Sequence, residues 1–257
     1  YEIMPSLVGS EMCIRDSDKI DIVYEDENIL LVDKPVGMVV HEDESGDSDT
    51  LINRIKSYLY RKGEYHPENE LSFAPALCNR IDRNTCGIVI AAKNAESLRI
   101  LNQKIRDREL TKLYLCIACG KVTPDSATLT AYLEKNSDTN TVKISDKKTK
   151  SNLTIKTKYK VIAYNGENSL LKVDLLTGRT HQIRAHLAYI GHALLGDGKY
   201  GNNKLNKKYG FKYQALCSYE LQFKFTTDAG CLSYLDGKCF KAKAPDFVKM
   251  FGANIKL

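Results

Sequence analysis

The sequence predicts an α+β fold, in which a mixed and largely antiparallel sheet is flanked by a few helices. Short apolar runs separated by polar turns recur along most of the chain, while helical periodicity is clear in only three segments. Such runs of strands, broken by few helices, favour α+β over a doubly wound α/β fold. The 257 residues suffice for a packed core, and no apolar run approaches the roughly 20 residues that span a bilayer, which argues against a membrane protein.

The first seventeen residues differ in character from the rest of the chain. The run LVGSEMCIRD, from Leu7 to Asp16, matches the translation of a common transposon-library sequencing adapter residue for residue. We therefore interpret residues 1–17 as a non-native segment and predict that residues 18–257 form a single domain. A signal peptide is disfavoured, because Glu11 and Arg15 follow only a short, weakly apolar stretch. Without this segment, 37 basic residues face 29 acidic ones, so the net charge rises from +6 to +8.

The elements are predicted in chain order. Residues 20–24 and 29–32 form a hairpin around a polar turn, and apolar residues at helical spacing predict a helix over residues 51–62. Two buried strands, 76–81 and 87–92, enclose a tight turn, and Asn94 can cap the helix that follows. Thr180 can cap a helix over 180–190, which leaves Arg184, His181 and His186 off the core. Further strands are predicted at residues 112–119, 153–164, 169–176, 214–225 and 231–238.

The cysteines indicate an intracellular protein. Outside the first segment they number seven, at irregular spacing and without a secretory signal, which does not suit a disulfide framework. Cys116 and Cys119 form a CxxC pair, but no second pair supplies the remaining ligands of a zinc site. We therefore expect a cytoplasmic protein that holds no metal.

The charge is distributed unevenly along the chain. Residues 18–50 carry a net charge of −9, whereas residues 141–160 carry +6 and residues 199–213 hold five lysines and no acid. Such asymmetry suits a face that meets a phosphate backbone. Solvated lysine-rich loops would explain it equally well.

The segment NRIDRNTCG, residues 79–87, is the first candidate for chemistry. It places Asp82 between Arg80 and Arg83 in a turn that joins two apolar strands. Neighbouring guanidinium groups favour the ionised carboxylate and would keep it ready as a nucleophile. The alternative is an aspartate that only satisfies the backbone of its turn.

The segment LLTGRTHQIRAH, residues 175–186, is the second candidate. It brings Arg179 to a helix N-terminus, which is a natural anion site, and it places Arg184 where the side chain could meet a carboxylate. His181 and His186 are five residues apart, which fits a single metal face poorly and favours structural or RNA-contacting roles. A glycine-rich loop then carries Lys199 and Tyr200 towards a ligand. GxGxxG, P-loop and HExxH motifs are absent from the sequence, so we expect no small-molecule cofactor.

Taken together and in this order, the motifs resemble the RluA-type RNA pseudouridine synthases. The resemblance covers residues 18–257 and is carried by LLVDKPVGMVVH, RIDRNTCGIVIAAK, LTKLYLCIACG, LLTGRTHQIRAHLAYIGHALLGDGKYG, YQALCSYELQF and FKAKAPDF. It implies the catalytic domain of a cofactor-free isomerase that converts uridine in RNA to pseudouridine. Many relatives also have a small RNA-binding domain ahead of this one, which we expect to be either absent here or lost at the adapter junction.

The resemblance assigns roles to individual residues. Asp82 is the implied nucleophile, Tyr114 the aromatic residue that stacks on the target base and aids proton transfer, and Arg184 the partner of the aspartate. Arg80 helps to fill the space that the flipped base leaves in the RNA stack, and Leu216 is a candidate wall of the uracil pocket. The other expected RNA-contacting residues are Arg83, Arg179, His181 and Lys199.

The sequence departs from the family pattern at two positions. Asn79 stands where many members have His, and Cys86 stands where Ser or Gly is usual. Asn79 suggests the subgroup that acts on large-subunit ribosomal RNA, with transfer RNA as the alternative substrate. We expect a monomer. Two competing hypotheses are a non-catalytic RNA-binding protein with the same fold and a metal-assisted hydrolase that uses His181, His186 and Asp197.

Overall fold

The computed structural model describes residues 19–42, 49–69, 73–136, 139–252 and 255–257. The segment predicted to be non-native, residues 1–17, lies outside the described residues, so its origin stays a prediction. No helix in the described part of the chain is long and apolar enough to cross a membrane.

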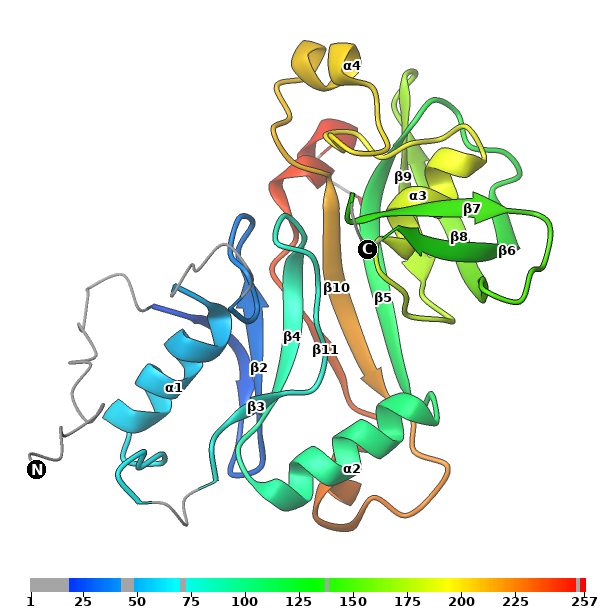
Figure 1. The fold of residues 1–257 in the computed structure, drawn as a ribbon. Helices are drawn as coiled ribbons and strands as arrows, with labels where there is room; N and C mark the ends of the chain where they lie inside the picture. The colour runs from blue at the N-terminus through cyan, green and yellow to red at the C-terminus, as the bar shows by residue number, and fades with distance from the viewer. Residues whose placement is uncertain (1–18, 43–48, 70–72, 137–138, 253–254) are drawn as a thin grey trace, which may run out of the picture.

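The described residues build one 11-stranded sheet, whose main path runs β1-β2-β4-β10-β5-β9-β8-β6-β7 (Figure 1). Its strands are β1 (Asp21–Glu25), β2 (Ile29–Lys34), β3 (Ala76–Leu77), β4 (Cys86–Ala92), β5 (Leu110–Cys119), β6 (Ser126–Asn136), β7 (Thr141–Ser145), β8 (Leu153–Tyr164), β9 (Asn168–Asp174), β10 (Leu216–Phe223) and β11 (Cys239–Lys241). β4 and β10 pair in parallel and the other pairs are antiparallel, which confirms the predicted mixed, largely antiparallel sheet.

Different helices cover the two faces of the sheet. The helices are α1 (Leu51–Arg61), α2 (Ala95–Arg106), α3 (Gln182–Tyr189) and α4 (Asn203–Lys208), with two 3-10 helices, η1 (Gly230–Leu235) and η2 (Asp246–Phe251). Apolar residues of α1 and α3 pack into the same core as Val32, Val89 and Tyr114. Apolar residues of α2 and η1 pack with Leu31 and Ile90, which point the other way along the same two strands. The site described below therefore lies on the α1 and α3 face.

Several predicted elements need correction. Residues 231–238 do not form a strand: they belong to η1 and the turn after it, because Leu232 and Leu235 are the buried residues and their spacing of three suits a 3-10 turn. The strand predicted at 76–81 is only two residues long. Thr180 does not cap α3. His181 occupies the N-cap position with φ of 51° and makes no side-chain capping bond.

Gly87 allows β4 and β10 to approach closely. It has φ of +105°, and a Cβ atom at this position would lie 2.2 Å from the backbone oxygen of Ser218. Gly87 and Ser218 are paired in the parallel register. The glycine thus brings β10 next to the strand that follows the Asp82 turn.

Candidate active site

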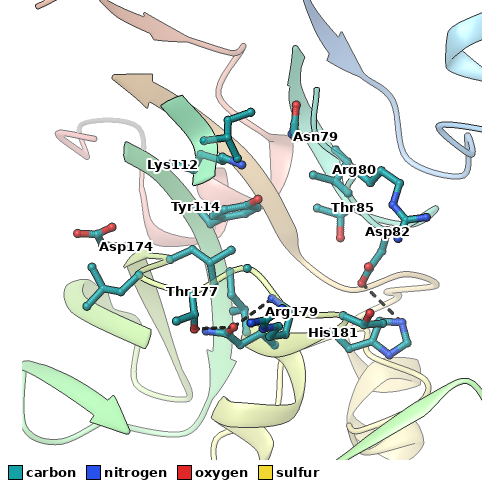
Figure 2. A pocket seen from close by; sticks show the side chains of 18 of the residues that line it. Asn79, Arg80, Asp82, Thr85, Lys112, Tyr114, Asp174, Thr177, Arg179 and His181 are labelled. Carbon is teal, nitrogen blue, oxygen red and sulfur yellow. Dashed lines mark hydrogen bonds and ion pairs between the residues drawn. The ribbon is translucent and has the colours of Figure 1, made fainter. Parts of the chain in front are cut away.

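A cleft of about 950 Å³ opens beside the turn that carries Asp82. Its walls come from that turn, the first residues of β5, the loop between β9 and α3, and Leu216 at the start of β10. Figure 2 shows Asp82 and His181 on one side of the cleft and Tyr114 and Lys112 on β5. Segments that are distant in sequence therefore meet in one place.

Arg184 connects the candidate nucleophile to a buried carboxylate. Its Nη1 donates to Oδ2 of Asp82 at 2.8 Å, while its Nε and Nη2 donate to the two oxygens of Asp197 at 2.7 and 3.0 Å. The Asp82 side chain is 28% exposed and that of Asp197 is fully buried. Burial alone would raise the pKa of Asp197, but the bonds from Arg184 lower it overall. Ionised Asp197 thus fixes the guanidinium group of Arg184, which in turn binds Asp82.

The structure corrects the expectation that Arg184 and His186 lie off the core. Arg184 is 5% exposed and His186 is 1% exposed, because α3 packs against β6, β7 and β8. Nδ1 of His186 is hydrogen-bonded to Oγ1 of Thr157 at 2.9 Å, and burial lowers the pKa of His186 to about 4. His181 faces Asp82 instead, so the two histidines have separate surroundings.

His181 is held in one orientation by Tyr200. The hydroxyl of Tyr200 accepts a hydrogen bond from the backbone N–H of Val142 and lies 2.9 Å from Nδ1 of His181. This contact fixes the orientation of the imidazole ring, with Nε2 on the side of Asp82. Nε2 lies 3.9 Å from Oδ2 of Asp82. Burial lowers the pKa of His181, so the neutral ring is the form that faces the cleft.

Tyr114 and Leu216 form the apolar side of the cleft. They lie on the neighbouring strands β5 and β10, and both are almost completely buried. Burial raises the pKa of Tyr114 to about 12, so its hydroxyl stays protonated at neutral pH. A planar aromatic ring beside an aliphatic wall suits the binding of a nucleobase.

The structure brings some of the expected RNA-contacting residues together and not others. Arg80 and Arg179 line the cleft with exposed side chains. Lys199 and Arg83 are not among the lining residues. The amino group of Lys199 donates to the backbone oxygen of Asn140, and the backbone oxygen of Arg83 accepts from Nζ of Lys34 at 2.9 Å.

Sequence reasoning missed two supporting residues. Lys34 is fully buried, and its amino group donates to the backbone oxygens of Pro35, Met38 and Arg83, which ties the β2 end to the Asp82 turn. Asp197 was considered only as a metal ligand. In the sequence, Lys34 is a lone lysine at the end of an apolar run. Asp197 is a lone acidic residue in the glycine-rich loop that follows the helix with Arg184.

The two residues that depart from the family pattern, Asn79 and Cys86, both lie where β4 pairs with a neighbouring strand. Oδ1 of Asn79 accepts a hydrogen bond from the backbone N–H of Ile90 at 2.8 Å and so continues the pairing of β3 with β4. Cys86 lies opposite Cys217 in the parallel register of β4 and β10, and both are free thiols.

Comparison with known proteins identifies the family. The family model described as RNA pseudouridylate synthase matches residues 28–189. An uncharacterized RNA pseudouridine synthase, MG370, of Mycoplasma genitalium is 38% identical over 213 residues, which cover 80% of this chain and 64% of the relative. The ribosomal large subunit pseudouridine synthase D of Borreliella burgdorferi is 33% identical over 190 residues, 74% of this chain and 57% of the relative.

A more distant relative and a solved structure extend the comparison. The mitochondrial tRNA pseudouridine(32) synthase of Saccharomyces cerevisiae is 31% identical over 193 residues, 74% of this chain and 38% of the relative. The chain thus spans less than two thirds of the length of these three relatives. The solved structure of human RNA Pseudouridylate Synthase Domain Containing 4 shares the fold, with a TM-score of 0.70, 18% identity and coverage of 90% of both chains. By its sequence, the chain belongs to the RNA pseudouridylate synthase family.

Proposed function

We propose that this chain isomerises uridine in RNA to pseudouridine, with Asp82 as the nucleophile. The observation that carries the proposal is the Asp82–Arg184 contact of 2.8 Å at the open side of a cleft whose other wall is Tyr114 and Leu216. The guanidinium group orients the carboxylate, while the aromatic ring and the aliphatic wall would hold the flipped base.

The reaction needs no external reactant. Attack of Asp82 on the ribose would break the bond between C1′ and N1 of uracil, and the free base would turn to present C5. A bond then forms between C5 and C1′, the bond to Asp82 breaks, and the proton of C5 is replaced by one on N1. Tyr114, which stays protonated and lines the cleft, would assist this transfer from beside the base.

We propose large-subunit ribosomal RNA as the substrate. Support comes from the similarity to a ribosomal large subunit synthase, while the similarity to a tRNA synthase makes transfer RNA the alternative. The cations that line the cleft, among them Arg80 and Arg179, suit either RNA.

Chemical mapping of pseudouridine after incubation with ribosomal and transfer RNA transcripts tests both parts of the proposal. We expect product on ribosomal RNA with the wild type and with Asp125→Asn, whose exposed side chain lies outside the cleft, and none with Asp82→Asn. Equal product from Asp82→Asn would remove the nucleophile assignment. RNA binding without product would favour a non-catalytic binding protein, and loss of activity with a chelator would favour a metal-assisted hydrolase.

A further inference from the structure

Part of the cleft lining, which we call the second lobe, is not used by the reaction as described. Residues from the β3 segment, the C-terminal end of α2 and the start of β5 line this lobe: Cys78, Asn79, Ile105, Arg106, Arg108 and Lys112. Three of these six carry a positive charge and none carries a negative one. Of the two carboxylates that line the cleft, Asp82 is bound to Arg184. Burial raises the pKa of the other, Asp174, and the positive charges of Lys158 and Lys224 partly oppose this rise.

Lys112 is the central residue of this lobe. It lies two residues before Tyr114 on β5, so both side chains are on the same face of the sheet, about 6.6 Å apart along the strand. Figure 2 shows its side chain extending beside Tyr114 into the cleft. Lys112 is half-buried, and this burial lowers its pKa.

Among the described residues, the amino group of Lys112 has no hydrogen-bond or ion-pair partner, in contrast to two other buried lysines. Lys34 donates to three backbone oxygens, and Lys104 donates to Glu109 and Thr227. An ammonium group that is partly removed from water without a partner reduces the stability of the fold. An anion that enters the lobe would supply the missing partner.

We propose that Lys112 and Arg106 form an anion subsite that binds a phosphodiester group of the RNA next to the target uridine. The inference rests on the proposed function, because it assumes that a base of this RNA lies against Tyr114. A phosphate at Lys112 would then be close to that base and would fix the register of the RNA strand in the cleft. Arg106, at the exposed end of α2, supplies a second donor at the rim.

The test measures equilibrium binding, which does not depend on turnover. Fluorescence anisotropy is recorded with a short single-stranded RNA that contains one uridine, and with versions in which one phosphate at a time is a neutral methylphosphonate. For Lys112→Gln we expect about tenfold weaker binding of the fully charged RNA. The slope of log K against log salt should fall by about 0.7 in magnitude. The matched control is Lys121→Gln, an exposed lysine beyond the other end of β5, for which affinity should stay within about twofold of the wild type.

The methylphosphonate scan locates the contact. A neutral linkage adjacent to the uridine should weaken binding to the wild type by about the same factor, and should have no further effect on Lys112→Gln. A penalty that is equal for both proteins at every linkage would overturn the subsite. Absence of pseudouridine, with this coupling present, would count against the proposed function alone.

A stability measurement separates binding from folding. Because Lys112 has no partner to lose, Lys112→Gln should unfold at the same temperature as the wild type or at a higher one. A lower unfolding temperature together with unchanged RNA affinity would make the lysine a structural residue and overturn the proposal.

Discussion

Asp82 and Asp197 are bound by two different sides of the same guanidinium group. Arg184 uses Nη1 for Asp82 and the pair Nε and Nη2 for Asp197, and the exposed fractions of the two carboxylates are 28% and 0%. In the described residues, Oδ1 of Asp82 makes no hydrogen bond, so it remains available to a substrate. The buried Asp197 therefore orients Arg184, and Arg184 orients Asp82.

Removal of Asp197 should damage both stability and activity. Asp197→Ala leaves the buried Arg184 without its bidentate partner, which should lower the free energy of unfolding by about 3–5 kcal/mol. Urea denaturation measures this loss, and the rate of pseudouridine formation should fall with it. The exposed pair Lys249–Asp246 is the control, since Asp246→Ala removes only a solvent-exposed ion pair and should leave the free energy of unfolding nearly unchanged. A cost for Asp197→Ala as small as that of the control would contradict the assignment.

The hydroxyl of Tyr200 should affect catalysis through His181. Tyr200→Phe removes the hydrogen bond that orients the His181 ring towards Asp82, so we expect kcat to fall by about tenfold with a smaller change in KM. In the background of His181→Gln, the same substitution should change kcat little, because its target is gone. Additive losses in the double variant would show that the two residues act independently.

His186 should make the fold sensitive to acid. Its pKa is about 4 in the folded state against 6.5 ordinarily, so the unfolded chain binds the proton more tightly. This contribution to stability is complete above pH 6.5 and is lost as the pH falls towards 4, with a slope of up to about 1.4 kcal/mol per pH unit. Urea denaturation at a series of pH values should show a shallower slope for His186→Gln. A slope for His186→Gln equal to that of the wild type would contradict this assignment.

Gly87→Ala should disrupt the pairing of β4 with β10. The new Cβ would lie 2.2 Å from the backbone oxygen of Ser218, and we expect a cost of more than about 4 kcal/mol. Gly252 also has φ of +105° but has open space around it, so Gly252→Ala reports only the strain of the backbone conformation. Comparison of the two unfolding temperatures separates the clash from the strain. Equal losses would show that the close approach has no energetic importance.

The sequence predicted the fold class well and the outer strands poorly. Alternation of apolar and polar residues was clear where a strand has one buried face in the main core, as in β8. The hairpin of β6 and β7 was missed, because only two residues are buried in each strand and the residues between and around them are mostly polar. The buried residues are Ala131, Leu133, Val142 and Ile144. Its strand character depends on pairing with β8 and on contact with α3, neither of which is local.

The candidate site was predicted in part for a similar reason. Asp82 and Arg184 could be identified because each is a charged residue within a motif that resembles one of a known family. Asp82 lies in a turn, and Arg184 lies near the start of a helix. Asp197 and Lys34 were missed because their importance comes from burial, which a local pattern does not report. The same limitation explains why Arg184 was placed off the core, since α3 has partners on more than one side.

The parallel pairing of β4 with β10 has a consequence for synthesis of the protein on the ribosome. Cys86 and Leu216, which meet in this pairing, are 130 residues apart in sequence. β4 therefore leaves the ribosome long before its partner, and its apolar edge waits unpaired while the intervening chain is translated. During this interval Asp82 lacks Arg184 until α3 has been translated, and it lacks the wall formed by Leu216 until β10 follows. Until β10 emerges, the cleft is therefore incomplete and one edge of β4 is open to pairing with other chains, which favours aggregation of the nascent protein.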